Sequence, residues 1–218
     1  MAGTGRGWMA AAISAGLLSA PCGAAAAEAL HSPTIGVLLM DDAGVAPEVL
    51  AHAKIHVTRI YREIGITVAW MSADDIDVDR RLTVKIVTKA FASKGIDGRT
   101  MGIAAGTPEK RGTLAYAFYS RIEGVTRTTG ADTGLILGHV IAHEIGHLLL
   151  PYGAHAERGL MRGAWDQEQA YKAAVGRLRF TLDEGALIRA RMQTLPERTT
   201  SASPLPVLDD QLGVTSVP

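Results

Sequence analysis

Apolar residues follow two different periods along the chain, and the shorter period predicts a β-sheet. Compact apolar runs rich in strand-forming residues predict buried strands at residues 34–40, 66–71 and 82–88. Residues 114–122 alternate between apolar and polar side chains, which is typical of a strand at the edge of a sheet. We therefore expect a mixed sheet whose edge strand runs antiparallel to its neighbour.

The longer, helical period predicts two helices that pack against this sheet. Apolar positions recur with helical spacing over residues 46–64, with Pro47 in the first turn and Gly65 just beyond the end. Residues 133–150 are apolar on nearly every face of a helix. A helix of that kind is stable only when other elements surround it, so we expect it at the centre of the fold.

A last helix is predicted at residues 181–193, where Thr181 as N-cap and Glu184 at the third position form a capping box. The expected order is strand, helix, two strands, edge strand, buried helix and final helix. This order predicts an α+β fold with an α/β-like sandwich, in which the mixed sheet lies over the buried helix.

The two ends of the chain differ from the centre. Residues 1–27 contain one charge, Arg6, then an apolar stretch and a run of small residues, which predicts a secretory signal peptide rather than a plain N-terminal extension. The expected location is thus secreted or periplasmic. Residues 195–218 are rich in Ser, Thr, Pro and Asp without a period, which predicts a flexible tail. Residues 28–194 are expected to form one catalytic domain.

Charge and cysteine content narrow the possible partners. The chain has 22 basic and 22 acidic residues and a low aromatic fraction of 5%, so nothing favours nucleic acid, or a membrane after signal removal, as a partner. The single cysteine, Cys22, lies inside the predicted signal peptide. Any metal in the mature protein must therefore be held by His, Asp or Glu. The oligomeric state cannot be read from these features.

The sequence HEIGH at residues 143–147 carries the clearest chemistry. On a helix, His143 and His147 lie one turn apart on the same face, so both imidazoles can reach one ion. Glu144 is rotated by about 100° from His143 and lies beside such an ion, where it can act as a general base. The competing interpretation is a helix with hydrogen-bonded core histidines, but burying these groups is costly unless they bind something.

A catalytic zinc ion needs three protein ligands, and two candidates exist for the third. His155 follows the helix breaker Pro151 and the flexible Gly153, where the chain would turn back under the helix. Glu168 is the alternative, as a carboxylate supplied by a downstream helix. Met161, six residues after His155, is either an apolar floor beneath the metal or a plain core methionine.

The joint order of these residues resembles the metzincin family of zinc metalloproteases. The stretch GAHAERGLM at residues 153–161 is similar to the glycine–histidine turn and Met-turn of the matrixin-like branch, although two extra residues precede the histidine and Leu150 replaces the usual glycine. The resemblance implies a zincin-type sandwich over an active-site helix. It also implies Zn²⁺ as cofactor, Glu144 as the general base, Met161 as the Met-turn and three zinc ligands: His143, His147 and His155.

The expected function is therefore an exported zinc-dependent endopeptidase, a hydrolase that cleaves peptide or protein substrates with a zinc-activated water and Glu144 as base. The strand around residues 114–120 would hold the substrate in an extended form. The alternative is a zincin-fold protein without peptidase activity, either a metal-dependent hydrolase of another amide or a binding module. The intact Glu144 favours the enzyme.

Overall fold

The computed structural model describes residues 32–75, 81–90, 99–107, 109–163, 165 and 167–194. The predicted signal peptide at residues 1–27 and the predicted tail at residues 195–218 lie outside the described residues, so both remain predictions. Within the described ranges, no helix combines the length and the apolar character needed to cross a membrane.

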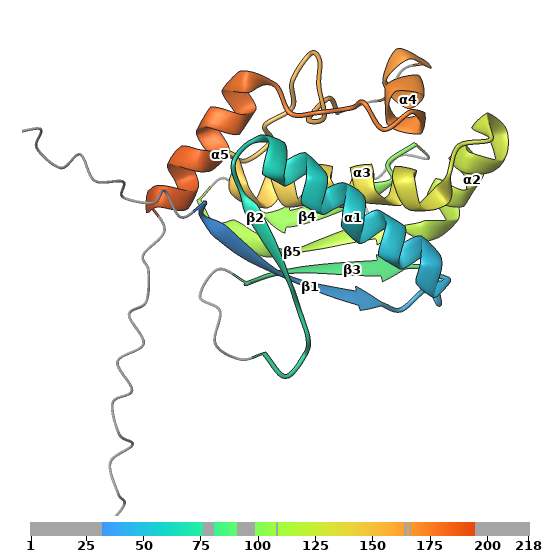
Figure 1. Ribbon diagram of the computed structural model, residues 1–218, viewed down its shortest axis with the longest axis horizontal. Helices are drawn as coiled ribbons and strands as arrows, with labels where there is room; N and C mark the ends of the chain where they lie inside the picture. Colours follow the sequence, from blue (N-terminus) through green and yellow to red (C-terminus); the bar gives the residue numbers. More distant parts are fainter. Residues whose placement is uncertain are drawn as a thin grey trace, which may run out of the picture. The chain divides into compact units, whose positions relative to one another are not determined.

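A mixed sheet forms one layer of the fold, with strand order β2-β1-β3-β5-β4 (Figure 1). Strand β1 runs parallel to both β2 and β3, β3 runs parallel to β5, and β4 runs antiparallel to β5. This arrangement confirms the predicted mixed sheet with an antiparallel edge strand. The strands are β1 (Thr34–Asp41), β2 (Thr67–Met71), β3 (Arg81–Val87), β4 (Gly102–Gly106) and β5 (Arg111–Phe118).

The edge strand is not the segment that the sequence pattern indicated. Residues 114–118 belong to β5, which lies between β3 and β4, so the prediction of an edge strand at 114–122 is wrong. The edge is β4, whose sequence GIAAG is too short and too small in its side chains to show an apolar period. The strand also stops earlier than predicted, because α2 (Tyr119–Thr129) begins directly after Phe118.

Two long helices, α1 (Pro47–Glu63) and α3 (Thr133–Leu149), lie side by side along one face of the sheet (Figure 1). Nearly every residue of α3 is buried, as its apolar sequence predicted. The carboxylate of Asp132 caps its first turn by accepting a hydrogen bond from the Leu135 amide at 2.7 Å. The predicted central helix is thus confirmed, and its start coincides with the predicted one.

The backbones of α1 and α3 approach closely because glycines face α1. A Cβ atom on Gly138 would lie 2.9 Å from the carbonyl oxygen of Ala53, too close for any side chain. The buried hydroxyl of Tyr61 donates a hydrogen bond to the carbonyl oxygen of Ala142 at 3.0 Å. Helix α1 therefore fixes the position of the turn of α3 that carries His143.

Two shorter helices, α4 (Gln167–Ala174) and α5 (Leu182–Thr194), follow α3. The predicted capping box forms at the start of α5: the Thr181 amide donates to the Glu184 carboxylate at 2.7 Å, and the Glu184 amide donates to the Thr181 hydroxyl at 3.3 Å. The α+β fold and its C-terminal helix are thereby confirmed.

Candidate metal centre

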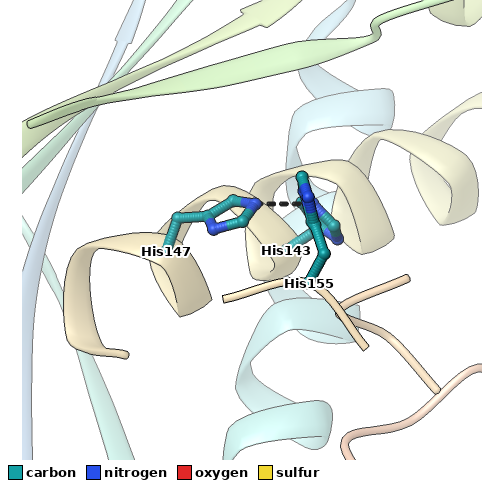
Figure 2. A group of neighbouring side chains, drawn as sticks. All are labelled: His143, His147 and His155. Atoms are coloured by element: carbon teal, nitrogen blue, oxygen red, sulfur yellow. Dashed lines mark hydrogen bonds between the residues drawn. The ribbon is translucent and has the colours of Figure 1, made fainter. Parts of the chain in front are cut away.

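Three histidines converge from two neighbouring segments. His143 and His147 project from α3, and His155 comes from the turn that follows it (Figure 2). One ring nitrogen from each histidine lies within 4.8 Å of the other two. The Nε2 atoms of His143 and His147 are 3.0 Å apart, and the ring centroid of His155 lies 4.7 Å from that of His147. Three imidazoles this close can hold one metal ion.

The turn after α3 brings His155 to this cluster. Helix α3 ends where the Leu150 amide donates its last hydrogen bond, to the Gly146 carbonyl oxygen at 2.8 Å. Pro151 follows, and Gly153 adopts a left-handed φ of +69°, which glycine tolerates without strain. The His155 amide then donates to the Gly153 carbonyl oxygen at 2.7 Å. The lengthened turn predicted from the sequence therefore closes on the helix.

Glu168, the alternative third ligand, does not join the histidines. It lies on α4 with an exposed side chain, and its carboxylate forms an ion pair with Lys172 one helical turn later at 2.6 Å. Among the residues that the structure describes, the histidine cluster is the only group of three or more His, Cys, Asp or Glu side chains close enough together to hold a metal ion. Of the two candidates, the fold brings His155 to the cluster.

A backbone carbonyl fixes the orientation of the most buried ring. The Nδ1 atom of His143 lies 2.7 Å from the carbonyl oxygen of Leu160. Because a carbonyl oxygen only accepts, Nδ1 must carry the proton, and Nε2 keeps its lone pair toward the other histidines. The Leu160 amide in turn donates to the Arg179 carbonyl oxygen at 2.7 Å. The loop that orients His143 is thus itself held by the segment before α5.

Two glycines make room for residues of this centre. A Cβ atom on Gly163 would lie 2.9 Å from Nδ1 of His155, so the imidazole packs directly on that backbone. A Cβ atom on Gly146 would lie 2.5 Å from the Sδ atom of Met161. Met161 is fully buried and therefore packs against the turn of α3 that carries both helical histidines.

Burial keeps the two helical histidines neutral. Desolvation, followed by the Coulombic effect of the neighbouring histidines, lowers the pKa of His147 to about 3. Desolvation also lowers the pKa of His143 to about 4. Neutral imidazole is the form that binds metals, so both rings are ready to bind an ion at neutral pH.

Three imidazoles without a thiolate fit Zn²⁺ and also suit copper, iron or nickel, so the donor set supports a metal ion without fixing its identity.

Glu144 follows His143 in α3, and its carboxylate points to the sheet. Its side chain is 5% exposed and reaches the edge strand, where a Cβ atom on Gly102 would lie 2.6 Å from Oε1. Burial raises the pKa of this carboxyl to about 8. A group that exchanges a proton near neutral pH can serve as a general acid or base.

Three further histidines line the interface between α1 and α3. Nδ1 of His52 lies 2.7 Å from the Asp132 carboxylate, and Nε2 of His52 lies 3.0 Å from Nε2 of His56. Arg59 donates to Nδ1 of His56 at 3.1 Å, so neutral His56 carries its proton on Nε2 and donates it to His52. His139 is fully buried and bonds the Leu135 carbonyl oxygen at 2.8 Å. Of these contacts, the one between His52 and Asp132 joins α1 to the residue that caps α3, and the sequence pattern did not reveal it.

Comparison with known proteins finds similarity only among solved structures. The sequence matches no protein-family profile and no curated protein. Its fold is similar to metalloproteinase-II from Bacteroides fragilis, with a TM-score of 0.44 and 17% sequence identity. The match covers 74% of this chain and 54% of the Bacteroides protein, so it spans about half the length of that protein.

Proposed function

We propose that the protein is a zinc-dependent endopeptidase of the metzincin type. The observation that carries this proposal is the convergence of His143, His147 and His155 within 4.8 Å of one another. Glu144, next to His143 on the same helix, is buried against the edge of the sheet. Three neutral ligands and an adjacent carboxylate form the set of groups that metal-assisted hydrolysis of an amide requires.

Each group has a distinct role in this proposal. The three histidines would hold the ion, which when bound supplies a Lewis acid that polarises the scissile carbonyl and makes water more acidic. Glu144 accepts the proton of the attacking water on a carboxylate oxygen. It then donates that proton to the amide nitrogen as the carbon–nitrogen bond breaks. Burial raises the pKa of Glu144, so its ionised form is a stronger base than an exposed carboxylate.

The free edge of β4 is the proposed binding site for the peptide. An extended peptide can add to a sheet edge through main-chain hydrogen bonds. Strand β4 is the edge next to Glu144, whereas β5, where the sequence pattern placed the substrate, is covered by β4. Three of the five residues of β4 are exposed, so this strand lies at the surface of the protein.

The cellular context remains part of the proposal. We propose that residues 1–27 direct export, so that residues 28–194 act as a secreted or periplasmic peptidase on peptide or protein substrates. This part is supported by the composition of the N-terminal segment and by the absence of any excess of basic residues.

Peptide cleavage by the purified protein tests the proposed reaction. A mixed peptide library is incubated with the zinc-loaded protein and, in parallel, with Glu144→Gln. We expect the parent to cleave and the variant to be slower by at least about 100-fold, the usual effect of losing a general base. Zinc content is measured in both samples, because equal content attributes the loss to the base.

Two results would contradict the proposal. Equal rates for the two proteins would exclude Glu144 as the base. No cleavage by a fully zinc-loaded parent would reject the endopeptidase, and non-peptide amides would then be the next substrates to test.

A further inference from the structure

The edge strand approaches the catalytic candidate Glu144 closely at Gly102. This glycine is buried, begins β4 and pairs with Ala117 of β5. A Cβ atom built on it would lie 2.6 Å from Oε1, 2.7 Å from Cγ and 2.8 Å from Cδ of Glu144. Ordinary contacts between such atoms are about 3.5–4.0 Å, so a side chain of any size would overlap Glu144.

The face of β4 that looks toward α3 is made of small residues. Alternate residues of a strand point to opposite faces, so Gly102 and Ala104 share one face and Ile103 lies on the other. Ala104 packs against the core, while Ile103 is 37% exposed. Small residues therefore stand where the strand approaches Glu144, and the residue in direct contact has no side chain.

The backbone of Gly102 does not itself require glycine. Six described glycines have a positive φ, and Gly102 is not one of them. Alanine would therefore fit its backbone conformation without strain. The contact with Glu144 is what excludes a side chain, and it involves the middle of the glutamate as well as its flexible end.

We infer that Gly102 is a positioning residue for Glu144. Its missing side chain creates the space in which the carboxylate lies, between α3 and the edge strand. This inference rests on the proposed function, because it assumes that Glu144 is the general base. An added methyl group would move the carboxylate by roughly 1 Å to reach normal contact distance. A displacement of that size costs about 100-fold in rate.

The first test separates positioning of the base from binding of metal and substrate. For zinc-loaded Gly102→Ala we expect kcat to fall by about 100-fold, with KM and zinc content close to those of the parent. The matched control is Gly124→Ala on α2, where a Cβ atom meets nothing within 4 Å, and it should retain the parent kcat. A Gly102→Ala variant with unchanged kcat would overturn the inference.

The second test does not depend on catalysis. Gly102→Ala is made in the parent and in Glu144→Ala, and the thermal midpoint Tm is measured for the metal-free proteins. If the two side chains compete for one space, Gly102→Ala lowers Tm in the parent and has little effect when Glu144 is absent. Equal shifts in both backgrounds would overturn the inference. Should the single variant fail to fold, recovery of folding in the double variant supports the same contact.

The two tests distinguish failure of this inference from failure of the proposed function. In one outcome, the parent protein cleaves no peptide, but the Tm shift of Gly102→Ala clearly depends on Glu144. This result would reject the peptidase function and support the contact between Glu144 and Gly102. An active parent whose kcat is insensitive to Gly102→Ala would retain the peptidase and reject the positioning role.

Discussion

The imidazole of His143 donates a hydrogen bond from Nδ1 to the carbonyl oxygen of Leu160 at 2.7 Å. Leu160 directly precedes Met161, whose side chain packs back against α3 at Gly146. The loop after α3 thus supports the helix twice, once by orienting a ring and once by filling the space beneath it.

Removing the histidine of the turn should nearly abolish zinc binding. His155→Ala deletes a donor rather than an outer hydrogen-bond partner, so we expect the affinity to fall by more than about 100-fold. Competition with a chromophoric chelator measures this affinity. Glu168→Gln is the matched control and should leave it unchanged, because Glu168 is ion-paired on α4. A larger effect of Glu168→Gln than of His155→Ala would reverse the assignment of the third ligand.

A methyl group on Gly163 should weaken zinc binding without removing any donor. In Gly163→Ala the new Cβ would lie 2.9 Å from Nδ1 of His155, so the ring must shift away from its present position. We expect the affinity to fall by about 10- to 100-fold, as for changes in groups that orient a ligand. The same chelator assay measures it, with Gly124→Ala as reference. An affinity equal to that of the reference would show that the ring adjusts freely.

Truncating Met161 to alanine should destabilise the protein more than replacing it with leucine, which has a similar volume. Met161→Ala leaves a cavity beneath α3 and should lower the free energy of unfolding by about 2–5 kcal/mol. Met161→Leu keeps most of the volume and should cost less than about 1.5 kcal/mol. Urea denaturation of the metal-free protein measures both values. Equal costs for the two variants would mean that Met161 does not fill a defined space.

Stability should fall in mild acid, and two histidines outside the metal centre contribute to this fall together with His143 and His147. Burial lowers the pKa of His56 and of His139 to about 4 from the usual 6.5. Between these two pH values the unfolded chain binds protons that the folded chain does not, so their contribution to stability is complete above pH 6.5 and is lost as the pH falls toward 4. Each such proton changes the free energy of unfolding by about 1.4 kcal/mol per pH unit.

Urea denaturation at several pH values between 4 and 7 measures this slope. The variant His139→Gln should show a shallower loss of stability with decreasing pH, because the proton of His139 no longer contributes. An unchanged slope in that variant would show that His139 titrates normally in the folded protein.

Local patterns were sufficient to predict the central helix and the turn that carries His155. Residues 133–150 are apolar on all faces, and the structure forms α3 from Thr133 to Leu149. The helix breaker Pro151 and the flexible Gly153 before His155 predicted a sharp turn, and the chain does turn back there. Such features depend on neighbours in sequence, so they can be read without knowing the rest of the fold.

The edge strand and its contact with Glu144 could not be predicted in this way. Strand β4 consists of glycine, alanine and one isoleucine, which give no period, and it forms because it pairs with β5. Helix α2 begins with an aromatic residue and contains several threonines, so its start looked like the end of a strand. The position of the Glu144 side chain against Gly102 depends on the register of β4 against β5. That register is a property of the assembled sheet.

The difference in sequence separation between these parts has a consequence for how the protein folds. His143, His147 and His155 are joined by short stretches of chain, and short loops close early at low entropic cost. Gly102 lies far earlier in the sequence and reaches Glu144 only when β4 has docked on β5. We therefore expect the segment that carries the three histidines to form before Glu144 reaches its place against Gly102. Under the proposed function, a newly made chain would then be able to bind its metal before its general base is in position.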